Sequence, residues 1–183
     1  FAFVETIHTL TRDSIEKIAF LEGHSELSER EVFDLSQALS RYYQIDRGTL
    51  GNETDILNDY RVVIIADPQE PFSEKDKYIL DQYLMQGGRI LWVVNGVRFS
   101  DEYLSQSGMT PVIPLELQID DMLFRYGVRV NATLVQDLQC LPVPVDVSSD
   151  PQQPNWQPMP WTYAPLLLTS HASPITRNLM QVS

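Results

Sequence analysis

The chain has 183 residues, of which 43% are hydrophobic and 21% are charged, a balance that indicates a folded globular domain and argues against disorder. It carries 13 Lys and Arg residues against 25 Asp and Glu residues, so its formal net charge is −12 and phosphate backbones are repelled. Nucleic acid is therefore not expected as a partner. One cysteine, Cys140, excludes an internal disulfide and a multi-cysteine zinc site.

No apolar run in the sequence is long enough to span a bilayer. The chain starts Phe-Ala-Phe-Val, with neither an initiator Met nor a signal peptide. We interpret it as a piece of a longer protein whose membrane segments lie outside this chain. Residues 1–16 are expected to form an amphipathic lead-in helix, and residues 17–183 a single α/β domain.

Short apolar runs that are typical of buried parallel strands recur along the first half of the chain. They cover residues 17–21 (KIAFL), 61–66 (RVVIIA) and 89–94 (RILWVV), and residues 44–50 are predicted to be an edge strand. Further strands are predicted at residues 128–135 and 164–169.

Helices are predicted between these strands from their start and stop signals. Ser28 with Glu31 forms a capping-box pattern that predicts a helix to about residue 43, and residues 73–86 repeat the pattern before Gly87-Gly88. A third helix is expected from Pro114 to Tyr126, where Gly127 would end it.

Alternation of strands and helices predicts a mostly parallel sheet that is covered on both faces. We expect a doubly wound α/β fold, a three-layer sandwich of the flavodoxin-like or class I glutamine amidotransferase-like kind.

Residues 138–163 interrupt this pattern with six prolines, which predict a long insertion without helix or ladder. Its large apolar side chains, Trp156, Met159 and Trp161, are candidate anchors for docking a partner. The alternative is that both Trp rings pack onto the domain's own sheet and close an exposed edge.

Ligands of open α/β sheets collect at the carboxyl ends of the strands. The predicted strand ends carry a candidate ligand crevice of five residues: Glu22, His24, Glu26, Asp67 and Asn95. The competing interpretation is structural, because carboxylates and hydroxyls cap helix starts and Asp-Pro is ordinary turn chemistry. Neither a metal nor a cofactor is expected, since no second His or Cys stands at ligand spacing near His24.

No catalytic residue is predicted. A hydrolase of this fold places its nucleophile on a strand-to-helix elbow, and the matching position here holds Asn95, which cannot attack an acyl group. The sequence contains no G-x-S-x-G stretch, and Cys140 lies in Gln-Cys-Leu-Pro, away from any elbow. A hydrolase that uses an unrecognised acid–base pair, such as Glu22 with His24, stays open as an alternative.

Several stretches resemble one family when taken in order. They are KIAFLEGHSEL, RVVIIADPQEPFSEKDKYILDQYLMQGGRILWVVNGV, LELQIDDMLFRYGVRV, residues 161–165 and HASPITRNL. Together they resemble the extracytoplasmic domain of the gliding-motility auxiliary component of ABC-type transport systems, often called GldG. The most telling parts are the turn of Gly23, His24 and Glu26 and the later helix entry of Pro68, Phe72 and Ser73.

The resemblance implies a non-enzymatic partner of ABC transporter membrane and ATPase subunits. It implies an anchor in membrane segments outside this chain, and a position on the extracytoplasmic (periplasmic) face of the bacterial inner membrane. It also implies an amidotransferase-like fold that lacks the catalytic residues. The residues themselves are also consistent with an alternative, a domain that binds a sugar or a peptide in the crevice.

Overall fold

A computed structural model describes residues 15–100, 103, 109–148, 153–168, 172 and 176. The chain divides into two compact units, residues 1–132 and residues 133–183. The lead-in helix expected at residues 1–16 lies outside the described residues except for Ile15 and Glu16, which are not helical. None of the helices in the described part of the chain is long and apolar enough to cross a membrane.

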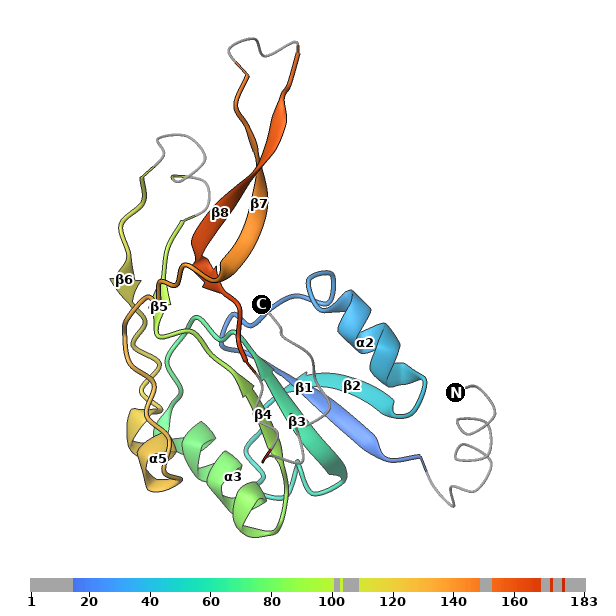
Figure 1. Ribbon diagram of the computed structural model, residues 1–183. Helices are drawn as coiled ribbons and strands as arrows, with labels where there is room; N and C mark the ends of the chain where they lie inside the picture. Colours follow the sequence, from blue (N-terminus) through green and yellow to red (C-terminus); the bar gives the residue numbers. More distant parts are fainter. Residues whose placement is uncertain are drawn as a thin grey trace. The chain divides into compact units, whose positions relative to one another are not determined.

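The first unit is built on a sheet of four parallel strands in the order β2-β1-β3-β4 (Figure 1). The strands are β1 (Lys17–Glu22), β2 (Gln44–Thr49), β3 (Tyr60–Ala66) and β4 (Ile90–Val93). All four were predicted, and β2 is an edge strand as expected. The prediction that β4 is buried is wrong, because β4 forms the other edge and leaves Leu91 and Val93 half exposed.

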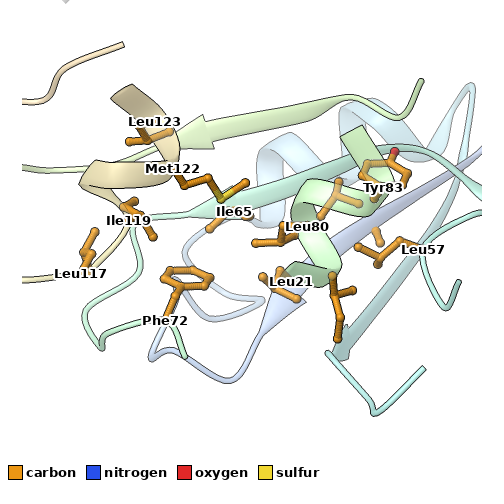
Figure 2. Packing of buried hydrophobic residues seen from close by; sticks show 13 residues of the cluster. Leu21, Leu57, Ile65, Phe72, Leu80, Tyr83, Leu117, Ile119, Met122 and Leu123 are labelled. Carbon is orange, nitrogen blue, oxygen red and sulfur yellow. The ribbon is translucent and has the colours of Figure 1, made fainter. Parts of the chain in front are cut away.

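Alternate residues of a strand point to opposite faces of a sheet, so apolar strands of this kind present side chains on both faces. Helices cover both of these faces. On one face, Leu21 and Ile65 join the larger core with side chains of α3 (Glu74–Met85) and α5 (Asp120–Arg125), as Figure 2 shows. On the other face, Phe20 and Ile64 form a smaller core with Val32 and with Leu39 of α2 (Phe33–Ser40). The first unit is therefore an α/β sandwich, as the alternation of elements predicts.

Helix α3 follows its sequence signals closely. The Ser73 side chain accepts the backbone N–H of Asp76, and the Asp76 carboxylate accepts the N–H of Ser73, so the predicted capping box is confirmed. Ile79 and Leu80 are buried on its core face, and Gly87 ends it with a φ of 92°.

Helix α2 begins at Phe33, five residues after Ser28, the first residue of the predicted capping box. Glu31 does accept hydrogen bonds from the N–H of Ser28 at 2.8 Å and from its hydroxyl at 2.6 Å. However, the N–H groups of Glu31 and Val32 both donate to the Ser28 carbonyl, so these residues close a turn before the helix.

The third helix is shorter than predicted. Pro114 lies in β6 (Ile113–Pro114), which pairs with β5 (Val97–Arg98) in a second small sheet, and α5 begins only at Asp120. The Leu115 N–H donates to the Gly96 carbonyl, and the Leu117 carbonyl accepts the Phe72 N–H, so tertiary hydrogen bonds replace the expected helical ones. Gly127 ends α5 with a φ of 82°, as expected.

The strand predicted at residues 128–135 is not formed, since no described residue pairs with this segment in a ladder. Its alternating pattern leaves only Val130 packed against the larger core. The last predicted strand, at residues 164–169, is also misplaced, because the strand that enters this region ends at Pro165.

The second unit contains an antiparallel hairpin of β7 (Cys140–Asp146) and β8 (Trp156–Pro165) (Figure 1). The prediction that prolines forbid a ladder at residues 138–163 is therefore wrong. In this register Pro142 lies opposite Pro160, and Pro144 lies opposite Pro158.

The spacing of the prolines explains why the ladder tolerates them. Antiparallel pairs alternate between a class that exchanges N–H···O bonds and a class that does not. The Val147 N–H donates to the Asn155 carbonyl at 3.0 Å, which identifies that pair as hydrogen-bonded. Hydrogen-bonded pairs recur at every second residue of β7 from Val147. Both proline pairs lie at the positions in between, so they belong to the class that does not exchange N–H···O bonds and the missing N–H is not needed.

Candidate functional site

The loop after β1 directs the side chain of His24 into the interior of the protein. Gly23 has a φ of 116° and Ser25 a φ of 55°, so two left-handed residues flank His24 and reverse the chain tightly. His24 is only 7% exposed. Its carbonyl accepts the N–H groups of Gln69 and Glu70 at 2.8 Å and 3.0 Å, which ties this loop to the loop after β3.

The imidazole of His24 is engaged on both nitrogens and on one face. Its Nδ1 lies 3.2 Å from Glu26 Oε1, and its Nε2 lies 3.5 Å from Asp76 Oδ2. The ring stacks on Phe72 with centroids 3.8 Å apart and planes inclined by 14°. We call His24, Glu26, Phe72 and Asp76 the His24 cluster. It connects the end of β1 to the entry of α3.

The electrostatics of the His24 cluster favour an ion triplet. Burial by itself lowers the pKa of His24, but the hydrogen bond and charge of Glu26 and the charge of Asp76 outweigh it and raise the pKa above its ordinary value of 6.5. Burial raises the pKa of Glu26 and of Asp76, and hydrogen bonds outweigh it. The pKa of each carboxyl group is therefore lowered.

A pocket of ≈ 360 Å³ opens beside this cluster at the carboxyl ends of the strands. The Asn95 side chain donates to Asp67 Oδ1 across it at 2.8 Å, and Asp67 has a φ of 52°. We call it the switch-point pocket; it is lined by Ser25, Glu26, Leu27, Glu31, Asp67, Gln69, Asn95, Val97, Arg98 and Phe99.

The position of this pocket follows from the strand order. The chain passes from β1 to β2 on one side and then crosses back to β3 on the other, so the order reverses between β1 and β3. Residues that follow β1, β3 and β4 line the pocket. Reversal points of this kind are where open α/β sheets bind their ligands.

The structure brings together three of the five residues predicted for the crevice. Glu26, Asp67 and Asn95 line the switch-point pocket. His24 is buried in its cluster, and Glu22 lies apart because its carboxylate accepts a hydrogen bond from Arg47 Nε of β2 at 2.7 Å. The structure therefore pairs His24 with Glu26 and Asp76, and not with Glu22.

Sequence reasoning missed three contributors to this site. Arg98 lies in the two-residue strand β5 and Phe99 follows it, and both line the pocket. A strand of two residues is too short to leave a periodic signal in the sequence. Asp76 was assigned to the helix start by its capping box, and it serves the His24 cluster as well.

The chemistry of the site is that of binding groups. Carboxylates, amides, one guanidinium and the Phe99 ring line the pocket, so it offers both hydrogen-bond donors and acceptors. The elbow position holds Asn95, whose amide is bonded to Asp67. No set of three His, Cys, Asp or Glu side chains that could hold a metal ion was found among the described residues.

The three docking residues predicted in the Pro-rich segment lie on β8, but they do not share one face. Residues an even number apart on a strand point the same way, so Met159 and Trp161 lie on one face of the hairpin and Trp156 on the other. All three are exposed, by 46%, 38% and 62%.

A family described as the ABC-type uncharacterized transport system has a model that matches residues 16–183. The chain belongs to this family. The match to this transport-system family includes the whole His24 cluster, the switch-point pocket and the β7–β8 hairpin. Among curated proteins, none matches the chain.

Among solved structures, the chain is similar to the mmIFT52 N-terminal domain, with 21% sequence identity and a TM-score of 0.49. The similarity covers 67% of this chain and 50% of that one. It therefore spans only half the length of that solved structure.

The His24 cluster makes stability depend on pH in a defined direction. Because the folded-state pKa of His24 is raised, its contribution is full below 6.5 and is lost as the pH rises through the folded-state pKa. The lowered pKa values of Glu26 and Asp76 make their contributions full above 4.5 and 3.8, and these are lost as the pH falls. The cluster therefore stabilises most between 4.5 and 6.5.

We expect His24→Gln to lower the free energy of unfolding by about 1–3 kcal/mol at mildly acidic pH, and by less at alkaline pH. Urea unfolding followed at both pH values measures this. The other two histidines are replaced as a control, because His8→Gln with His171→Gln should preserve the pH dependence of the parent. A His24→Gln protein with the same pH dependence as the parent would show that the cluster does not form.

Proposed function

We propose that this chain is a non-enzymatic, extracytoplasmic binding domain of an auxiliary protein in an ABC-type transport system. The observation that carries the binding role is the switch-point pocket, which the fold places where α/β sheets hold ligands. Membership of the transport-system family supports the auxiliary role.

The state of His24 supports a non-enzymatic role. A general base needs a ring nitrogen within reach of the proton that it removes. Both ring nitrogens of His24 face carboxylates, its ring stacks on Phe72, and little of the residue meets solvent. The same arrangement that fixes the loop therefore occupies the groups that catalysis would use.

The GldG-like character is proposed on the two motifs that carry the resemblance. The turn with His24 and the helix entry with Phe72 lie 48 positions apart in the sequence, and the structure stacks these two rings. The strand order β2-β1-β3-β4 supports a flavodoxin-like arrangement, which begins 2-1-3-4. We extend the proposal to a role in gliding motility and to association with transporter membrane and ATPase subunits.

Co-purification tests the transport role. The full-length protein, tagged and extracted in mild detergent from the cells that produce it, is expected to retain an ABC ATPase and its membrane subunits after cross-linking. Mass spectrometry identifies these subunits, and an unrelated tagged membrane protein is the control. Quantitative recovery of the bait without any transporter subunit would contradict the assignment.

Ligand binding is tested with Asp67, which lies in the pocket and bonds to Asn95. A panel of oligosaccharides and short peptides is expected to include a compound that raises the Tm by several degrees at saturation, because ligands that bind only the folded state stabilise it. Asp67→Ala should abolish the rise, whereas Glu53→Ala, an exposed carboxylate outside the pocket, should keep it. Equal responses of Asp67→Ala and the parent protein would remove the pocket from the proposal.

The location is tested with Cys140, the one cysteine of this chain, which is partly exposed in β7. In spheroplasts that express the full-length protein, a membrane-impermeant maleimide is expected to label Cys140 without lysis. Cys140→Ser identifies any signal from cysteines elsewhere in the full-length protein. Labelling that appears only after lysis would place the domain on the cytoplasmic side.

A further inference from the structure

We infer that the switch-point pocket binds a peptide of two or three residues with free termini and holds both termini by ion pairs. Glu31 and Asp67 bind the ammonium group, and Arg98 binds the carboxylate. This inference rests on the proposed function, because it names the class of ligand that the pocket recognises. It selects a short peptide over a neutral sugar.

The lining of the pocket carries charges of opposite sign toward its two ends. The strand order β1-β3-β4 places Glu26 first, Asp67 in the middle and Asn95 last along the carboxyl edge of the sheet. Glu31 belongs to the turn that follows the loop after β1, whereas Arg98 lies in β5, beyond Asn95. Carboxylates therefore come from the side of β1 and β3, and the one guanidinium of the described lining comes from the side of β4.

The two carboxylates nearest β1 differ in what they already bind. Glu26 is occupied, because Oε2 accepts the backbone N–H of His24 at 2.7 Å and Oε1 lies 3.2 Å from its Nδ1. Glu31 accepts both of its hydrogen bonds from Ser28 at one oxygen, Oε2. The hydroxyl and the N–H of Ser28 lower the pKa of Glu31, so this carboxylate is charged at neutral pH. Its other oxygen has no partner among the described residues and can accept an ammonium group.

Asp67 and Arg98 also keep unused bonding capacity. Asp67 accepts the Asn95 amide at Oδ1, and no described residue donates to its second oxygen. Arg98 forms no ion pair within the described part of the chain, and its planar fork of N–H groups fits a carboxylate. A ligand with both charges pairs with both ends of the pocket, whereas a neutral ligand would desolvate these charges without pairing them.

The spacing of the strands sets the length of the ligand. Neighbouring strands lie about 5 Å apart, so the ends of β1 and β4, with β3 between them, are about 10 Å apart. A chain of two or three residues spans at most about 7–11 Å. A single amino acid is too short to reach from the carboxylates at β1 to the guanidinium beyond β4.

The rest of the lining fits the middle of a short peptide. The pocket volume of ≈ 360 Å³ is at the lower end of the range in which proteins bind small molecules. The Phe99 ring is 50% exposed and lines the pocket with Leu27 and Val97, so apolar side chains of the ligand have a surface to contact. The amides of Gln69 and Asn95 can bond to the peptide groups.

Isothermal titration calorimetry of the chain tests the inference. The probes are free dipeptides and tripeptides that end in Phe, Leu, Lys, Glu or Ser, and maltotriose and chitobiose are the neutral comparison. At least one free peptide is expected to bind saturably. Its N-acetylated and C-amidated forms should each bind about tenfold more weakly or worse, because each lacks one of the two charges. These comparisons use the parent protein, so they do not depend on the folding of a variant.

Two variants assign the termini to their partners. Arg98→Gln should bind the free peptide about tenfold more weakly than the parent and should no longer distinguish it from the C-amidated form. Glu31→Gln with Asp67→Asn should no longer distinguish the free peptide from the N-acetylated form. Arg41→Gln removes an exposed guanidinium outside the pocket, and this matched control should bind like the parent. Thermal unfolding of each variant shows whether it is folded.

The outcomes separate this inference from the proposed function. Binding of an oligosaccharide that Asp67→Ala abolishes, without binding of any peptide, would overturn the inference and leave the pocket as a binding site. Equal affinity of the parent for free and capped peptides would overturn the ion pairs and with them the inference. If no probe binds, the inference is also wrong, and co-purification still decides the transport role.

Discussion

The residue His24 joins three segments of the chain, in addition to the hydrogen bonds from Ser25 to Glu70 and from Leu27 to Ala66. The three segments are the loop after β1, the loop after β3 and the first turn of α3, which meet through the carbonyl of His24, its two ring nitrogens and its stacked face. These segments form the carboxyl end of the sheet at the point where the strand order reverses. His24 therefore helps to hold together the loops that line the switch-point pocket.

The contacts that hold His24 also limit what its imidazole can bind. Both ring nitrogens of His24 face carboxylates, and these carboxylates raise the pKa of the imidazole above its ordinary value. The lining of the neighbouring pocket offers donors, acceptors and an aromatic ring, but the elbow after β4 has an amide where a nucleophile would stand. The polar lining of the pocket therefore offers groups that can hold a molecule by hydrogen bonds.

Local signals predicted those elements whose stability is itself local. The capping box of α3, the left-handed glycine at its end and the β-branched run of β3 all act within a few residues, and all three were predicted correctly. The start of α5 was not, because hydrogen bonds from Leu115 to Gly96 and from Phe72 to Leu117 hold the preceding segment. Such bonds join residues far apart in sequence and leave no periodic pattern.

In the candidate site, too, some features could be predicted from local sequence signals and others could not. Its strand ends were predicted because parallel strands point their carboxyl ends to one edge, and this placed Glu26, Asp67 and Asn95 in one pocket. The pairing of His24 with Asp76 required the three-dimensional approach of the loop after β1 to the first turn of α3. The Pro-x-Pro spacing of β7 and β8 did carry information, since prolines two residues apart fall in one class of antiparallel pair.

The proline ladder also sets a timescale for the second unit. No peptide bond in the described residues is cis, so the four ladder prolines are all trans in the folded hairpin. In an unfolded chain roughly 10–30% of each X–Pro bond is cis, so on the order of half of the molecules start with at least one wrong isomer. Correction takes tens to hundreds of seconds without a prolyl isomerase. The folding of the β7–β8 hairpin is thus expected to include a slow phase that a prolyl isomerase accelerates.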